Sequence, residues 1–191
     1  MIFETIVTSV NPDGSAHIAP FGIRERDGLV LISPFRPSRT LDNLLRNGCA
    51  VINATTDVRV FAGSLTGRSD WPVRRSTSIA GWVLQSALSH RELELVEVQE
   101  HEQRPELTFR VKHQALHAPF QGFNRAQAAV IEAAVLVSRL SMLPIEKIES
   151  EIKYLAIAME KTAGEQELQA WGWLMERIEN YKAEMRGENQ A

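Results

Sequence analysis

The sequence predicts a mainly β fold with added α-helices: a small antiparallel β-barrel in residues 1–122 and a C-terminal helical subdomain in residues 123–191. Three observations support this prediction. Short β-rich segments separated by tight turns fill the N-terminal part. One short amphipathic pattern interrupts them, which favours a barrel with an inserted helix over a doubly wound sheet. After Phe123 the apolar residues recur every three or four positions, as they do on helices.

Four strands are expected before the first long irregular segment, at residues 2–10, 16–26, 29–32 and 49–55. The first strand is rich in β-branched residues, and the sequence after it, Asn11-Pro12-Asp13-Gly14, is a strong turn. Asp27-Gly28 provides a second tight turn. The segments therefore predict a meander of antiparallel strands.

A short helix is expected between the third and fourth strands. Ser38 can cap its first turn, the apolar face is formed by Leu41, Leu44 and Leu45, and Gly48 can end it. Cys49 begins the next strand, and we expect its side chain to point into the core.

The middle of the chain gives a weaker signal. Residues 57–78 predict a loop with one helical turn, in which Trp71 is either a lid or a core plug. Two long strands follow, around residues 92–98 and 107–112, and their alternation predicts an antiparallel pair with one solvated face.

Three helices are expected in the helical subdomain, with breaks at Pro144 and near Gly164. Arg125, Glu132 and Arg139 are spaced by seven residues, which places them on one stripe of a helix. Small apolar neighbours predict that this stripe is partly buried. Buried charges must be paired, so we expect a structural Arg–Glu–Arg arrangement or pairing across a dimer, with direct ligand contact as the alternative.

Composition excludes several classes of protein. The chain of 191 residues is 44% hydrophobic and 24% charged, as in ordinary globular proteins. Its net charge of −3 argues against nucleic acid as the main partner. No apolar run approaches the roughly 20 residues of a membrane span. The lone Cys49 excludes an internal disulfide and predicts a reducing, cytoplasmic location.

The basic residues of the N-terminal part are all arginines. Between Met1 and Gly81 there are nine Arg, no Lys and seven acidic residues. Because the planar guanidinium pairs bidentately with phosphate, this bias favours an anionic ligand. Drift in composition explains the same bias equally well.

The most informative stretch for function is Arg36-Pro37-Ser38-Arg39-Thr40-Leu41-Asp42-Asn43. It combines guanidinium groups, hydroxyls and the amides of a helix start, which are the groups that bind a phosphate monoester. The alternative is a capped surface helix with solvated arginines.

Several short motifs carry a resemblance to a known family. They are Pro20-Phe21-Gly22, Ser33-Pro34-Phe35, Ser38-x-Thr40-x-x-Asn43, Val51-Ile52-Asn53, and a C-terminal signature from Phe123-Asn124-Arg125-Ala126 through Val130-Ile131-Glu132-Ala133 to Ser138-Arg139-Leu140. In this order they resemble the FMN-binding split barrel of flavin reductases and pyridoxamine-phosphate oxidases. More closely, the chain resembles the domain-of-unknown-function 447 family, DUF447, over nearly its whole length.

The resemblance implies an FMN bound at a homodimer interface. The residues that would hold the ribityl phosphate are Arg36, Ser38, Arg39, Thr40 and Asn43. Those that would line the isoalloxazine or its polar edge are Ala19, Pro20, Phe21, Gly22, Ser33, Asn53 and Thr55. Alternatives stay open for some of them: Phe21 and Phe35 as core residues, and Ser33 and Asn53 as hydrogen-bonding residues at sheet ends.

Catalytic groups are not evident in the sequence. The histidines show no metal-ligand spacing, and His17, close to the implied flavin segment, is the one that merits a test. We expect an FMN-dependent oxidoreductase of the flavin-reductase type acting on a small soluble substrate, with NADH or NADPH as candidate donors. The alternatives are a flavin carrier or sensor without enzymatic activity, and a helical interaction module on a barrel scaffold.

Overall fold

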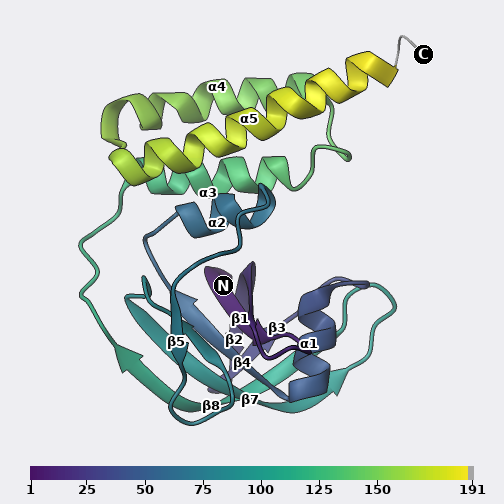
Figure 1. Cartoon of the computed structure of the whole chain (residues 1–191), viewed down its shortest axis with the longest axis vertical. Coiled ribbons are helices and arrows are strands. Elements are labelled where there is room, and N and C mark those ends of the chain that lie inside the picture. Colours follow the sequence, from purple (N-terminus) through teal and green to yellow (C-terminus); the bar gives the residue numbers. More distant parts are fainter. Residues whose placement is uncertain (189–191) are drawn as a thin grey trace. The chain divides into compact units, whose positions relative to one another are not determined.

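The structure of the protein is a computed structural model that describes residues 1–188, and it consists of two compact units (Figure 1). The barrel unit comprises Met1–Thr56 and Ser69–Phe120. The helical unit comprises Asp57–Arg68 and the chain from Gln121 onward. The helical unit therefore includes a segment from the sequence range expected for the barrel.

The barrel unit contains a closed six-stranded barrel in the order β1-β2-β3-β8-β7-β4, and all neighbouring strands are antiparallel. Its strands are β1 (Phe3–Val10), β2 (Ala16–Arg26), β3 (Leu29–Ile32), β4 (Cys49–Ala54), β7 (Ser89–Gln99) and β8 (Glu106–Leu116). The predicted fold class and the predicted long strand pair are confirmed.

One short helix, α1 (Arg39–Asn47), packs against the barrel core. Ser38 caps it by accepting a hydrogen bond from the Leu41 amide, and Gly48 ends it in the left-handed conformation at φ 62°, as the sequence predicted. The barrel core is built from apolar side chains of the strands and of α1: Val7, Ile23, Val30, Ile32, Leu41, Leu44, Ala50, Ile52, Leu93, Leu107 and Phe109.

A two-stranded hairpin, β5 (Val73–Arg75) and β6 (Trp82–Leu84), lies outside the barrel. It is fastened to the outer face of β1 and β4, where Thr8 donates to the Trp82 carbonyl and Asn53 accepts from the Leu84 amide. The expectation for Cys49 is wrong. Ala50 and Ile52 face the core, so strand alternation turns Cys49 outward, where its Sγ lies 3.8 Å from the Ala80 oxygen.

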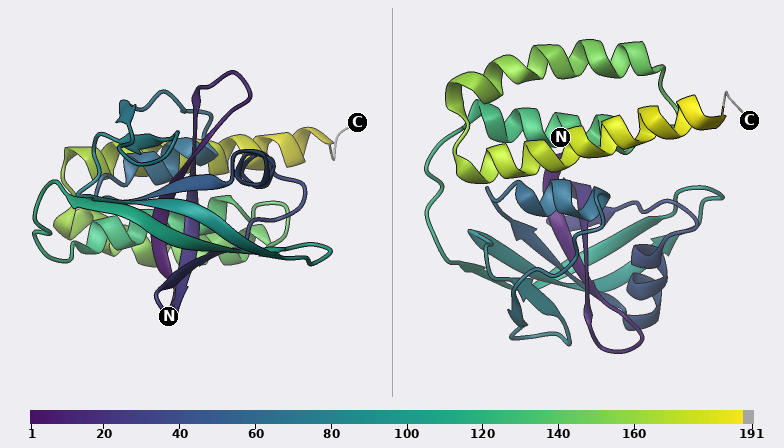
Figure 2. Two further views of the ribbon diagram at one scale, coloured as in Figure 1. Left: turned by 90° about the horizontal axis from the view of Figure 1, so that it is seen from below. Right: turned by 45° about the horizontal axis from the view of Figure 1, so that its top comes forward.

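The helical unit consists of α2 (Arg59–Leu65), α3 (Arg125–Val137), α4 (Ile145–Thr162) and α5 (Glu165–Glu188). Figure 2 shows α3, α4 and α5 side by side. The predicted breaks are confirmed, because Pro144 precedes α4 and Gly164 precedes α5. Small residues of α3 fill much of the core, which comprises Val58, Ala62, Ala126, Ala129, Val130, Ala133, Ala134, Val137, Leu140, Ile148, Met159, Ala170, Leu174 and Ile178. Within residues 1–188, no helix is both long and apolar enough to cross a membrane.

The expected burial of the Arg125, Glu132 and Arg139 stripe is wrong. All three residues are exposed within the chain, and Arg139 lies beyond the end of α3. The alanines that suggested burial are spread around the helix, and its buried side is formed by Ala126, Ala129, Val130 and their neighbours. Exposed charges need no partner to be stable.

Candidate functional site

The candidate site begins with one edge of β2. Residues 16–23 of this strand pair with β1, whereas β3 pairs only with Arg24–Arg26. Among the described residues, no strand covers the other edge of residues 16–23, which we call the β2 edge. Such an edge presents backbone N–H and C=O groups to a ligand that lies along it.

The start of α1 lies against one end of the β2 edge. The Nε2 atom of His17 on β2 is 3.0 Å from the hydroxyl oxygen of Thr40, which is buried. Burial lowers the pKa of His17, and the positive charge of Arg39 lowers it further. The contact places a neutral, polar pair of side chains between β2 and the helix start.

The first turn of α1 offers groups suited to an anion. Ser38 accepts from Leu41, so the amides of Arg39 and Thr40 have no partner within the helix. The helix dipole adds about half a positive charge at this end. The side chains of Arg36 and Arg39 are exposed, and Arg36 pairs with Glu100 at 2.5 Å.

Asn43 is buried and holds α1 against the end of β1. Its Nδ2 donates to Ser9 Oγ and Asn11 Oδ1, both at 3.1 Å, and its Oδ1 accepts from Arg46. These bonds engage the carboxamide fully within the chain, so Asn43 acts on the helix start by fixing its position.

A cavity of about 480 Å³ lies at the other end of the β2 edge. Its lining joins β2 to the connection between β7 and β8: Ile2, Gly22, Arg24, Ser33, Gln99, Glu100, His101, Arg104 and Glu106. Arg24 donates to Ser33 Oγ at 3.1 Å and pairs with Glu106 at 2.7 Å, and Arg104 donates to the Ser33 carbonyl at 2.8 Å.

Gly22 lines this cavity together with Ile2. A Cβ atom at position 22 would lie 2.8 Å from Ile2 Cγ2 and 3.4 Å from Glu4 Oε1, so the absence of a side chain lets Ile2 lie close to the backbone of β2. Its neighbours alternate in direction. Phe21 packs against the barrel core, and Pro20 shares the outer face with Gly22.

Phe35 is not a core residue, which was one of the two alternatives considered for it from the sequence. Its side chain is 61% exposed, and the guanidinium of Arg104 lies 4.7 Å from the ring centroid. The exposed aromatic ring is therefore covered on one face by the cationic group of Arg104, a residue that lines the cavity.

The structure places Asn53 and Thr55 away from the β2 edge. Asn53 is fully buried; its Nδ2 donates to the Ile6 carbonyl at 3.1 Å, and its Oδ1 accepts from Leu84. Strand β1 separates it from β2. Thr55 donates to the Ser86 carbonyl at 2.8 Å. Both side chains connect β4 to the segment that contains β6.

The sequence reasoning missed Arg24 and Arg104. Arg24 had a signal, since it lies two residues after Gly22 on the same face of a predicted strand. Arg104 reaches Ser33 from 71 positions further along the chain, and no local pattern indicates such a contact.

Comparison with known proteins identifies the family. Residues 3–118 match the family model described as the N-terminal domain of the protein of unknown function DUF447, and residues 124–176 match the companion DUF447 model. The chain belongs to the DUF447 family. A comparison with curated proteins gives no match.

Solved structures share the fold of this DUF447 chain. The crystal structure of an FMN-bound DUF447 protein from Methanosarcina mazei has 22% identity and a TM-score of 0.78, and the match covers 92% of this chain and 94% of the other. A 2-nitrobenzoate 2-nitroreductase from Pseudomonas fluorescens matches at 21% identity and a TM-score of 0.51, over 60% and 64% of the two chains. An FMN-binding protein from Thermus thermophilus matches at 17% and 0.51, over 61% and 71%.

Proposed function

We propose that the chain binds FMN along the β2 edge and acts as a flavin-dependent oxidoreductase on a small molecule. The observation that carries this proposal is the arrangement of the β2 edge between a helix start with two amides unbonded within the helix and a cavity lined by Gly22. The same fold in an FMN-bound relative supports it.

The donor set at the start of α1 fits a phosphate monoester. The amides of Arg39 and Thr40 would donate to phosphate oxygens, and the guanidinium groups of Arg36 and Arg39 would neutralise their charge. Ser38 and Asn43 would act by fixing the helix start, because their side chains are already bonded within the chain.

The cavity end of the β2 edge fits a planar ring. Backbone groups of residues 19–22 would bond its polar edge, and Gly22 would allow the ring to approach the strand. Ser33 would be oriented by Arg24 and Arg104. For Asn53 and Thr55 the family assignment to the polar edge stays a proposal, which would require their present bonds to change.

A second copy of the chain would complete the ring site. Ile2 and Phe35 are 63% and 61% exposed at or beside the cavity, and exposed apolar side chains around a polar site are typical of an interface. We therefore propose a homodimer with FMN between the protomers. Sedimentation of the FMN-loaded protein as a monomer would contradict this arrangement.

When bound, the flavin supplies the hydride or electron transfer. The chain would bind, orient and partly shield it. Anaerobic mixing of the FMN-loaded protein with NADH or NADPH tests the activity, and we expect the flavin absorbance to bleach with one of them. Bound FMN that resists both donors would favour the carrier or sensor.

The phosphate assignment is tested by comparing FMN with riboflavin, which lacks the phosphate. We expect Arg36→Ala and Arg39→Ala to weaken FMN binding by about 1.5–3 kcal/mol, or roughly 10- to 150-fold, the range for one lost charge-assisted bond. Riboflavin binding should change much less. Fluorescence titration of both ligands measures the difference.

Arg110→Ala is the matched control, because Arg110 is an exposed arginine on β8 outside the candidate site. It should bind both ligands as the wild type does. Equal losses for FMN and riboflavin in the Arg36 and Arg39 variants would mean that the segment acts through folding, and would overturn the phosphate assignment.

A further inference from the structure

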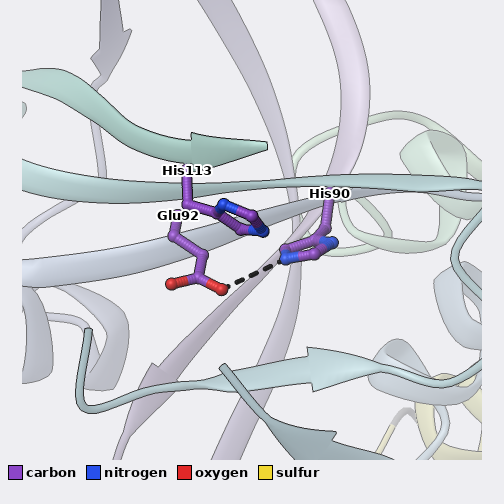
Figure 3. Close-up of side chains that lie close together, drawn as sticks. All are labelled: His90, Glu92 and His113. Carbon is purple, nitrogen blue, oxygen red and sulfur yellow. Dashed lines mark hydrogen bonds and ion pairs between the residues drawn. The ribbon is translucent and has the colours of Figure 1, made fainter. Parts of the chain in front are cut away.

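Three side chains with metal-binding atoms converge on the outer face of the barrel, away from the β2 edge. His90 and Glu92 are two residues apart on β7 and so share a face, and His113 on β8 is the register partner of Glu92 (Figure 3). One ligand atom from each residue lies within 4.8 Å of the others.

The cluster is covered rather than solvated. The side chains of His90 and Glu92 are 1% and 0% exposed, and His113 is half-buried. Burial distinguishes this group from the acidic clusters that are common on protein surfaces, since a buried charged group must be compensated.

The carboxylate of Glu92 is fixed by the segment that precedes β6. Its Oε1 accepts from the Thr77 amide at 2.6 Å, and its Oε2 accepts from the amides of Ser78 and Ile79 at 2.5 and 3.2 Å. Three backbone N–H donors therefore hold the Glu92 side chain in one rotamer. Its Oε1 is left facing His90 Nε2 at 3.2 Å.

His90 is held from its other side by His117. Its Nδ1 lies 2.8 Å from His117 Nε2, and one Arg74 nitrogen lies 2.7 Å from the same Nε2 and 3.3 Å from His117 Nδ1. These contacts fix the imidazole ring, so its Nε2 atom stays directed at Glu92.

A bound cation would find two ready ligands in His90 Nε2 and Glu92 Oε1, because these atoms already face each other. We propose that His90, Glu92 and His113 bind one divalent transition-metal ion of the zinc class, with the remaining position taken by water. Two imidazoles and one carboxylate form a common ligand set for such ions. Ligands about 2.0–2.2 Å from a tetrahedral metal lie roughly 3.3–3.6 Å apart, close to the His90–Glu92 distance.

The surroundings fit this assignment. Metal-bound histidines usually have a hydrogen-bond partner at their second ring nitrogen, and His90 Nδ1 lies 2.8 Å from His117 Nε2, which Arg74 contacts in turn. The ion would join β7 and β8 to the segment 77–79 through Glu92. His113 would complete the set from the neighbouring strand, since its ligand atom lies within 4.8 Å of the other two.

Metal titration of the full chain tests the proposal. After removal of metals with a chelator, the protein is titrated with Co²⁺, whose visible absorption reports its ligands, and with Zn²⁺ by calorimetry. We expect one equivalent of either ion to bind with a tetrahedral Co²⁺ spectrum. His113→Asn and Glu92→Gln should each weaken binding by about tenfold or more.

His101→Asn is the matched control, since His101 is an exposed histidine outside the cluster. It should leave the stoichiometry and spectrum unchanged. Glu92→Gln also disturbs the segment 77–79, so the half-buried His113 provides the variant that keeps the fold, checked by circular dichroism.

The competing occupant of the space between His90 and Glu92 is a proton. Failure of the wild-type chain to bind Co²⁺ and Zn²⁺, with nitrogen NMR showing both His90 nitrogens protonated, would overturn the proposal. Binding that persists unchanged in both ligand variants would overturn it too, because the ion would then lie elsewhere.

Discussion

The half-buried His17 shows how the proposed anion site can affect the pKa of a neighbouring side chain. It contacts Thr40 across the gap between β2 and α1, close to the exposed guanidinium of Arg39. Burial and that positive charge both lower its pKa, so the folded chain holds a neutral imidazole there. A neutral His17 can exchange hydrogen bonds with Thr40 without adding charge beside Arg39.

The lowered pKa of His17 gives a stability prediction with a definite sign. Below its ordinary value of 6.5, the unfolded chain binds the proton more readily than the folded chain. The contribution of His17 is therefore fully present above that pH and is lost as the pH falls through the lowered pKa.

Urea unfolding of the wild type and of His17→Gln between about pH 7.5 and 5.5 measures this contribution. We expect the wild type to lose more free energy of unfolding than the variant over this interval, because only the wild type must protonate the imidazole. Parallel losses in the two chains would mean that another group is responsible.

At the scale of elements, local signals predicted the fold well and the contacts between distant elements poorly. Ser38, Gly48 and Pro144 mark element ends through their own backbone and capping chemistry, so the ends were legible. For α2 the sequence predicted only one helical turn within a loop, because its apolar face is matched by residues of α3 and α5 more than 60 positions away.

Strand register limited what could be inferred about sites. Strands β7 and β8 carry irregularities between Glu92 and Leu93 and between Leu95 and Glu97. A slip of one residue would turn His113 to the opposite face, so the cluster with Glu92 depends on these bulges. Alternation in the sequence looked imperfect there, but it did not show which residues would face each other. The contact of Arg104 with Ser33 could not be predicted either, because the two residues are 71 positions apart in the sequence.

On the scale of the whole molecule, the chain is divided between two cores that are interleaved in the sequence. Helix α2 lies between strands of the barrel unit, yet Val58 and Ala62 belong to the core of the helical unit. The barrel unit is therefore not a continuous segment that can be cut out. Removing the C-terminal helices would leave α2 with an uncovered apolar side.

A chain ending at residue 120 tests this. We expect it to bind a dye specific for apolar surface, such as ANS, and to form aggregates larger than a dimer, whereas the full chain should do neither, because α2 loses the partners of Val58 and Leu65. Fluorescence and light scattering measure the two effects. Adding Val58→Ser and Leu65→Ser to the shortened chain should reduce both. A shortened chain that neither aggregates nor increases the fluorescence of ANS would contradict the prediction.

The interleaved helix also affects how the protein is made. Helix α2 ends at Leu65 and α3, its first partner helix, begins at Arg125. At roughly 5–20 residues per second, a ribosome therefore needs about 3–12 s to reach the start of α3. During that interval the barrel strands emerge and can pair, while the apolar side of α2 has no partner. The speed of translation across residues 66–124 thus sets how long this apolar side is exposed. Slow codons there would lengthen the time during which the nascent chain needs a chaperone.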